Sequence, residues 1–394
     1  MDTVFPKRGV LIMKMTRRGF VGTVGLGSAA GLLASAGLTS KKANAASSYE
    51  AQAVYDGGIM QLNQNESARG PGPKTMEAIR SHVTRRVGRG YDPDHVNELR
   101  ATLADGYGVT TDNVILSTGS GPLLVGAARA FCSQSKALVT TGPTYTTAEQ
   151  TARLIGAPIR SIQVDSSTMG VNLEGSAEAA VGAGLVYFCN PNNPTGTVHS
   201  PEAVESFIRR VQRESPNTKM LIDEAYFNYA ADDAMQTALP MAMEFENVFI
   251  TRSFSKAHGM AGLRVGYALG HKATLDAVSS AWGLGDVNML SAIAAITAFN
   301  DKEHIEWERQ ENTEIRAFVV AAFNDMGYDV PDSHTNHIFV NLGKPAKEFR
   351  DACLENKILV GRDFPPFEQT HCRISMGSRE EMQEAVAVFR KVLA

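Results

Sequence analysis

Short apolar runs alternate with amphipathic stretches of helix length between residues 114 and 270, and this alternation constrains the fold more than any other feature. Each apolar run has the length of a buried strand, and helical periodicity lies between most of them. Such alternation is typical of an α/β domain with a mostly parallel central sheet. The runs that we predict as strands are residues 114–117, 137–140, 185–189, 220–223 and 248–251.

The chain beyond Asn300 has a different pattern, which predicts a smaller α+β domain. A long charged amphipathic stretch predicts a helix over residues 302–326, and a final helix begins at Arg379. Between them lie apolar runs that we predict as strands, at 337–341, 357–360 and 372–375. We predict an N-terminal segment that joins the small domain, a large domain and the C-terminal small domain, over residues 46–85, 86–298 and 299–394.

The first 45 residues predict an export signal rather than part of the fold. A twin-arginine pattern at Arg17 and Arg18 precedes a Gly/Ala/Leu-rich apolar run and the small-x-small sequence that ends at Ala45. The alternative is a retained transmembrane anchor, but the apolar run is interrupted by glycines and is barely long enough to span a bilayer. We therefore expect export by the twin-arginine route to the periplasm, with no stable membrane insertion after cleavage. Met13 or Met15 remains open as the true start.

The composition favours a small-molecule partner. The net charge of −4 gives no basic footprint for nucleic acid. The four cysteines are widely spaced, with no CxxC and no clustered histidines, so the sequence predicts neither a metal site nor a disulfide framework. One disulfide in an oxidising compartment stays open.

Lys256 follows the last predicted strand of the large domain, where ligands of α/β domains bind. Hydroxyls of Ser253 and Ser255 flank it, and Arg264 comes eight residues later. This is what an aldehyde cofactor carrying a phosphate requires, because the amine forms a Schiff base and the other groups bind the dianion. By itself, this motif would more often belong to a solvated loop lysine.

Further motifs follow two other predicted strands and complete a specific combination. They are NPNNPTG at 190–196 and DEAY at 223–226, which join SFSKAHGMAGLRVGY at 253–267 and RISMG at 373–377. With them the chain, from about residue 55 to its end, resembles the class I/II aminotransferases that depend on pyridoxal phosphate (PLP), and among them the histidinol-phosphate aminotransferase branch. The resemblance implies the fold-type I PLP-transferase fold and transamination between an amino acid, or a related amine, and a 2-oxo acid.

The resemblance also implies roles around the cofactor ring. Lys256 would hold the cofactor and act as general base. Asp223 would sit against the pyridine nitrogen and keep it protonated, so that the ring remains an electron sink. Asn193 and Tyr226 would hydrogen-bond the phenolic oxygen, and Tyr145 would stack on the ring.

The cofactor phosphate is assigned by the same resemblance to a set of hydroxyl, guanidinium and amide donors: Ser253, Ser255, Arg264 and the backbone amides of Ser120 and Gly121. The sequence departs from the family at Pro122, which stands where an acidic residue is usual and has no N–H to donate. Tyr91 matches a tyrosine that reaches the phosphate of a neighbouring subunit, which implies a homodimer with shared active sites.

Substrate binding is implied for four residues. Arg373 matches the arginine that forms a fork with the substrate carboxylate, and Asn65 and Asn336 match residues near the substrate pocket. Arg362 resembles a second anion-binding arginine, but Gly361 intervenes in the family pattern, so a surface arginine is an equal alternative.

Two other functions remain as alternatives. A PLP-dependent lyase or decarboxylase could use the same fold, since the bond that breaks depends on alignment over the ring. A non-catalytic PLP-binding protein is disfavoured, because it would have no need of Lys256, Asp223, Asn193, Tyr226 and Arg264 together. Because histidine biosynthesis uses phosphorylated intermediates in the cytoplasm, an exported enzyme is expected to use another amino donor than histidinol phosphate.

Overall fold

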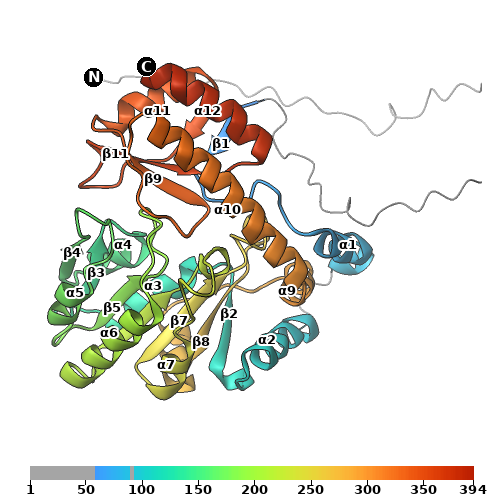
Figure 1. The fold of residues 1–394 in the computed structure, drawn as a ribbon. Helices are drawn as coiled ribbons and strands as arrows, with labels where there is room; N and C mark the ends of the chain where they lie inside the picture. The colour runs from blue at the N-terminus through green and yellow to red at the C-terminus, as the bar shows by residue number, and fades with distance from the viewer. Residues whose placement is uncertain (1–57, 89–92) are drawn as a thin grey trace, which may run out of the picture. The chain divides into compact units, whose positions relative to one another are not determined.

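A computed structural model describes residues 58–88 and 93–394 of the chain (Figure 1). The predicted export signal and Tyr91 lie outside the described residues. Within the described part, no helix combines the length and the apolar character needed to cross a bilayer.

A seven-stranded sheet forms the centre of the large region, in the order β2-β8-β7-β6-β5-β3-β4. Strands β3 to β7 pair in parallel, and β8 runs antiparallel to both of its neighbours. This confirms the predicted α/β class with a mostly parallel sheet. The strands are β2 (Val114–Ser117), β3 (Leu138–Gly142), β4 (Ile159–Gln163), β5 (Leu185–Cys189), β6 (Lys219–Asp223), β7 (Val248–Ser253) and β8 (Gly266–Gly270).

Helices cover both faces of this sheet, because side chains alternate along each strand. On β5, for example, Tyr187 packs in the cluster that contains α3, α4 and α8, whereas Phe188 packs in the opposite cluster, which contains α2, α5, α6, α7 and α9. The first group is α3 (Gly121–Phe131), α4 (Thr147–Leu154) and α8 (Lys272–Ala281). The second group is α2 (Asp94–Tyr107), α5 (Leu173–Ala179), α6 (Pro201–Glu214), α7 (Leu239–Glu244) and α9 (Met289–Asn300).

The C-terminal region, orange to red in Figure 1, has a core of its own. Its strands form an antiparallel pair, β9 with β11, and a parallel pair in which the N-terminal β1 joins β10. Met60 and Leu62 of β1 therefore pack inside the C-terminal core. Its elements are β1 (Met60–Leu62), α10 (Lys302–Asp325), β9 (His337–Asn341), α11 (Ala346–Glu355), β10 (Ile358–Val360), β11 (His371–Ser375) and α12 (Arg379–Leu393). Helix α1 (Pro73–His82) leads from β1 toward the large region.

The strands predicted from apolar runs are all present within a residue or two of their predicted ends, and so is the long C-terminal helix. Two strands of the large sheet were not predicted. Strand β4 has the sequence IRSIQ, with polar residues at three of its five positions, because it lies at the edge of the sheet. Strand β8 begins inside the glycine-rich stretch after Lys256. The predicted domain boundaries stay predictions.

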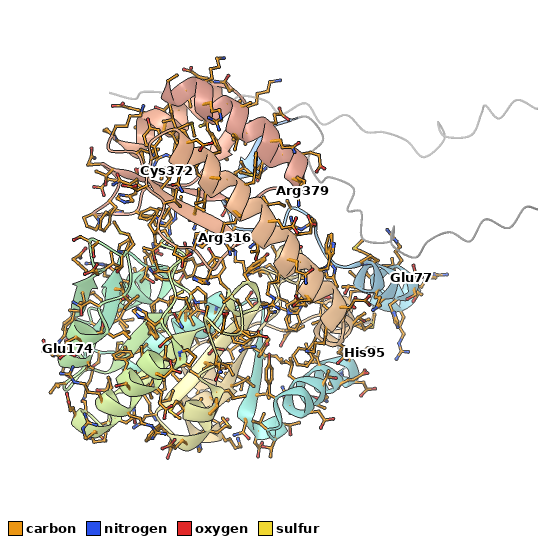
Figure 2. The ribbon with its side chains drawn as sticks, viewed as in Figure 1. Glu77, His95, Glu174, Arg316, Cys372 and Arg379 are labelled. Carbon is orange, nitrogen blue, oxygen red and sulfur yellow. The ribbon has the colours of Figure 1, made fainter. Side chains whose placement is uncertain are left out.

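The four cysteines are buried free thiols. Cys132 and Cys189 pack in the large region, and Cys353 and Cys372 pack in the C-terminal core, where Figure 2 labels Cys372.

A buried ion pair connects the N-terminal segment to α10. The Arg69 Nε and Nη2 donate to the two carboxylate oxygens of Glu308 at 2.6 and 2.8 Å, and Tyr229 donates a third hydrogen bond to Glu308 at 3.1 Å. The side chains of Arg69 and Glu308 are 6% and 0% exposed. Because both charges are withdrawn from water, each depends on the other for compensation.

We expect Glu308→Gln to lower the free energy of unfolding by about 3–5 kcal/mol, because it leaves the Arg69 guanidinium buried without a counter-charge. The measurement is urea unfolding of the full chain. Asp351→Asn is the matched control, since Asp351 pairs with Lys347 at the surface and its loss should cost less than about 1 kcal/mol. Equal effects of the two variants would contradict the prediction.

Candidate active site

A cavity of about 280 Å³ opens where β5, β6 and β7 end, and its walls come from both regions of the chain. All predicted site residues line it except Asn336 and Tyr91, and Tyr91 lies outside the described residues. The lining residues are Gln64, Asn65, Glu66, Ser120, Gly121, Tyr145, Cys189, Asn193, Asp223, Ala225, Tyr226, Ser253, Ser255, Lys256, Ala261, Arg264, Arg362 and Arg373.

Asp223, the last residue of β6, is buried and accepts hydrogen bonds from neutral donors. The Tyr187 hydroxyl donates to its Oδ2 at 2.9 Å and the Thr251 hydroxyl to its Oδ1 at 3.1 Å. These donors come from β5 and β7, the two strands that pair with β6. Burial raises the pKa of Asp223 to about 6, against the lowering effect of the two hydrogen bonds. A cation placed in the cavity would stabilise the charged form.

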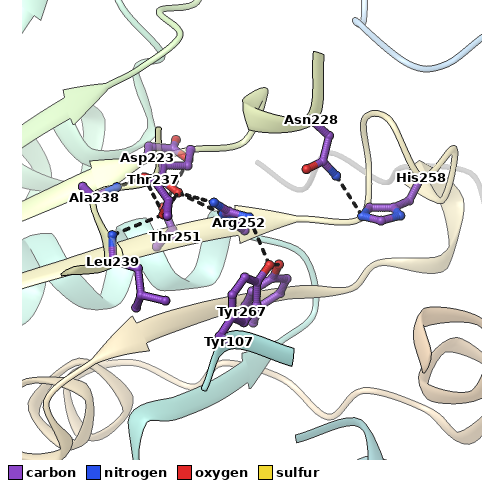
Figure 3. A network of polar contacts seen from close by, with 11 residues as sticks. Tyr107, Asp223, Asn228, Thr237, Ala238, Leu239, Thr251, Arg252, His258 and Tyr267 are labelled. Carbon is purple, nitrogen blue, oxygen red and sulfur yellow. Dashed lines mark hydrogen bonds and ion pairs between the residues drawn. The ribbon is translucent and has the colours of Figure 1, made fainter. Parts of the chain in front are cut away.

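The neighbouring carboxylate, Glu224, is fully paired, and Figure 3 shows its partners Thr237, Ala238 and Arg252 in one network of polar contacts. Arg252 donates to it from Nε and Nη2 at 2.9 and 2.7 Å, and Thr237 and the amide of Ala238 complete its shell. Arg252 in turn donates to Tyr107 at 3.0 Å. The adjacent carboxylates of Asp223 and Glu224 thus have different environments. Glu224 is paired with Arg252, whereas Asp223 has no cationic partner in the described part of the chain.

Lys256 Nζ lies in the cavity and donates to the backbone carbonyls of Gln64 and Asn65 at 3.2 and 3.0 Å. Burial and the nearby charge of Arg373 lower the pKa of this amine to about 8. About one-tenth of the amine is therefore neutral and nucleophilic at pH 7, against less than about one part in a thousand for an ordinary lysine.

A set of donor groups, the phosphate cradle, forms another part of the cavity wall. It consists of the Ser253 and Ser255 hydroxyls, the Arg264 guanidinium and the amides of Ser120 and Gly121. Arg264 has the left-handed φ of 55° and donates from Nη1 to the Ser255 hydroxyl at 3.2 Å. Gly119 is also left-handed, with φ 81°, and a Cβ there would lie 2.1 Å from Arg264 Nη2. A Cβ at Gly266 would lie 2.4 Å from the backbone of Gly119. Both glycines are needed for β8 and the β2–α3 turn to meet at the N-terminus of α3, with Pro122 in the first turn.

Asn65 of the N-terminal segment orients the Tyr226 side chain. The Asn65 side-chain nitrogen donates to the Tyr226 hydroxyl at 2.9 Å and to His337 Nδ1 at 3.0 Å. Burial lowers the pKa of His337 well below its usual value, so the ring is neutral and its Nδ1 accepts. Ser375 donates to Asn65 Oδ1 at 2.7 Å. Since Tyr226 accepts a hydrogen bond from Asn65, its own proton can be donated into the cavity.

Arg373 and Arg362 supply two further cations. Arg373 is 5% exposed and donates from Nη1 to Asn193 Oδ1 at 2.8 Å and from Nη2 to the carbonyl of Asn63. Its Nε is buried without an acceptor. Burial and, to a smaller extent, the charge of Arg362 lower the pKa of Arg373 to about 10. Arg362 is exposed at the rim and has no carboxylate partner in the described part of the chain.

Asn336, predicted near the substrate pocket, contacts the N-terminal segment that lines the cavity. It is not among the lining residues, because its amide nitrogen donates to the carbonyls of Asn65 and Glu66 at 3.0 and 3.3 Å and so holds the N-terminal segment against the cavity. Asn65 lines the cavity, but its amide is used to orient Tyr226.

Sequence reasoning missed several neighbours of the predicted residues. Tyr187 and Thr251 lie inside apolar strand sequences and give no motif signal; only the register of β5, β6 and β7 places them on the face of Asp223. Cys189 also lines the cavity, and so does Glu66, the residue that follows Asn65.

These residues fit PLP. Asp223 is a buried carboxylate that faces the cavity without a cation, Lys256 is a buried amine of lowered pKa, and the glycine-dependent cradle presents hydroxyl, guanidinium and amide donors to a phosphate. The fold and this donor set define a PLP-dependent enzyme of the fold-type I class.

Comparison with known proteins agrees with this class and gives the family. Residues 57–389 match the model of aminotransferase class I and II. Among curated proteins, the histidinol-phosphate aminotransferase of Symbiobacterium thermophilum is 31% identical over 85% of this chain and 91% of its own length. The histidinol-phosphate aminotransferase 2 of Pseudomonas aeruginosa is also 31% identical, over 85% and 89%.

Solved structures show the same relationship. The histidinol-phosphate aminotransferase of Sinorhizobium meliloti in complex with pyridoxal-5′-phosphate superposes with a TM-score of 0.77 at 26% identity, over 85% of this chain and 91% of that one. The aspartate aminotransferase of Thermus thermophilus, at 19% identity and a TM-score of 0.75 over 85% and 92%, shares the fold. The chain belongs to the class I and II aminotransferase family. It is a PLP-dependent aminotransferase that transfers an amino group between amino acids and 2-oxo acids.

We expect Tyr187→Phe to weaken PLP binding about tenfold at pH 7, because a hydrogen bond to a charged group is removed and the pKa of Asp223 in the cofactor-free protein rises further from about 6. A higher pKa leaves less of the carboxylate ionised to pair with the ring nitrogen at pH 7, so the deficit should shrink toward pH 8.5. The measurement is the pH dependence of PLP affinity. Tyr328→Phe, in the C-terminal region, is the matched control. A deficit that does not change with pH would contradict this account.

Proposed function

We propose that this aminotransferase exchanges amino groups among amino acids and 2-oxo acids of which at least one carries a second anionic group. The proposal rests on the charged side chains that line the cavity. Four cations, Lys256, Arg264, Arg362 and Arg373, and two carboxylates, Asp223 and Glu66, line it. Arg264 lies in the phosphate cradle and Lys256 is the cofactor amine, so two arginines remain for substrate.

Bound PLP supplies an aldehyde that condenses with amines and a ring that accepts electrons. Lys256 Nζ anchors it and, when free, accepts the proton from the substrate Cα; its lowered pKa suits that task. Asp223 would keep the ring nitrogen of bound PLP protonated, while Tyr226 and Asn193 would bind its phenolic oxygen. The proposed roles of Ser253, Ser255 and Arg264, with the amides of Ser120 and Gly121, are to hold the phosphate.

Arg373 is proposed to bind the α-carboxylate. Its planar fork is pre-oriented by Asn193 and the Asn63 carbonyl, and the residue lines the cavity. Arg362, at the rim of the same cavity, is proposed to bind the second anion. Tyr145 completes the wall beside the ring.

The holoenzyme should transfer amino groups to 2-oxoglutarate with kcat/KM at least tenfold above pyruvate, since a second arginine–carboxylate contact adds more than about 1.4 kcal/mol. Arg362→Ala should remove this preference, and Lys256→Ala should abolish transfer to either acid. The assay is amino-acid product formed from each acid. Equal use of both acids by the unaltered enzyme would refute the two-anion proposal, and undiminished transfer by Lys256→Ala would refute the role of the lysine.

The chain is further proposed to be an exported homodimer that uses a free amino acid as donor. The twin-arginine pattern at Arg17 and Arg18 supports export, and the match of Tyr91 to a phosphate-binding residue of a neighbouring subunit supports shared sites. A monomer in sedimentation at working concentration would exclude the shared site. A strong preference for histidinol phosphate over free amino acids would exclude the proposed donor.

Arg17→Lys with Arg18→Lys should abolish export and leave the uncleaved chain in the cytoplasm, because the pair is the recognised part of such signals. Fractionation of a host with the twin-arginine route measures this, with Lys41→Arg as a control outside the pair. Unchanged distribution of the paired variant would contradict the export proposal.

A further inference from the structure

One aromatic ring contacts both of the arginines that remain for substrate. The guanidinium carbon of Arg362 lies 4.6 Å from the ring centroid of Phe364, and that of Arg373 lies 5.0 Å from the same centroid. Phe364 is 2% exposed and is not among the residues that line the cavity. It lies in the loop between β10 and β11.

The Phe364 ring packs against the antiparallel pair of strands β9 and β11. Phe339 of β9 is the register partner of Arg373 on β11, so the two side chains leave the same face of this pair of strands. The Phe364 ring meets the Phe339 ring edge-on, with centroids 5.9 Å apart and planes at 84°. Phe339 in turn stacks on His371 at 4.9 Å. The position of Phe364 is therefore set by the strand register that also positions Arg373.

No carboxylate neutralises either guanidinium in the described part of the chain. The protein acceptors of Arg373 are the neutral oxygens of Asn193 and Asn63. Asp363, adjacent to Arg362 in sequence, pairs instead with Arg350. The two guanidinium groups repel each other, since the charge of Arg362 contributes to lowering the pKa of Arg373.

An aromatic face is well suited to this position. The negative face of the ring attracts both cations and offsets their mutual repulsion, but it takes up none of their N–H donors. A carboxylate in its place would occupy those donors and cancel the charge that a substrate is to meet. The ring thus holds two guanidinium groups close together while leaving them free to bind anions.

We infer that Phe364 is a positioning residue that sets specificity: it holds Arg362 and Arg373 as a pair that takes the two carboxylates of dicarboxylic amino acids and 2-oxo acids. The inference rests on the proposed two-anion function and names the residue through which the two sites are coupled.

The test compares full-length holoenzymes with one-carboxylate and two-carboxylate ligands. Phe364→Leu should raise KM for 2-oxoglutarate about tenfold and KM for pyruvate no more than about twofold, with little change in kcat, because Arg373 keeps its hydrogen bonds to Asn193 and Asn63, whereas no hydrogen bond or ion pair holds Arg362 in the described part of the chain. Calorimetric binding of glutarate, a dicarboxylate that cannot react, should weaken by the same factor as KM for 2-oxoglutarate, whereas binding of butyrate should change little.

Three variants control for packing. Phe364→Tyr keeps the ring and should retain the preference for dicarboxylates. Phe367→Leu removes a neighbouring ring that also packs on Phe339 but contacts no guanidinium, so it too should retain the preference. Phe364→Met fills a similar volume without a π face, and it replaces Phe364→Leu if the leucine variant fails to fold.

In an Arg362→Ala background, Phe364→Leu should affect glutarate and butyrate equally, because the second guanidinium is gone. Equal weakening of both ligands in the single Phe364→Leu variant, or no change in either, would overturn the inference. The two-anion function itself fails separately, if the unaltered enzyme binds glutarate no more tightly than butyrate.

Discussion

The burial of a carboxylate at the carboxyl end of β6 is the constraint around which the active site is arranged. Asp223 accepts hydrogen bonds from the hydroxyls of Tyr187 and Thr251 and from the backbone of Ala225, it has no cationic partner in the described part of the chain, and burial raises its pKa to about 6. Withdrawing a carboxylate from water costs several kcal/mol unless a cation compensates. Its neighbour Glu224 has such a partner in Arg252. The uncompensated group faces the cavity, and this makes the protonated ring of the cofactor a fitting occupant.

The parallel sheet and the N-terminal segment supply the rest of the geometry. Adjacent strands carry the donors to Asp223, since β5 and β7 flank β6. From the opposite side, backbone carbonyls of Asn63, Gln64 and Asn65 accept hydrogen bonds from Arg373 and Lys256. The placement of these acceptors depends on the pairing of β1 with β10, and therefore on the C-terminal core.

The sequence predicted the parts of the site that form local motifs. Lys256, Asp223, Asn193 and Arg373 each follow or lie in a strand whose apolar run was visible, and the cavity brings all four together. Tyr187 was not predicted, because a tyrosine in the run LVYFC has no local signal of its role. Asn336 lies near the site but binds backbone rather than the cavity, and a single sequence does not specify side-chain direction across two regions. Strand β4 was missed because an edge strand needs little apolar character.

The deep placement of the cysteines affects the chemistry of the chain in an oxidising environment. Burial raises the pKa of Cys132, Cys353 and Cys372 to about 12 and raises that of Cys189 as well. A thiol with a pKa near 12 is ionised in about one molecule in 100,000 at pH 7, and the thiolate is the form that attacks disulfides and peroxides. Burial of all four sulfurs therefore disfavours disulfide exchange in the folded chain.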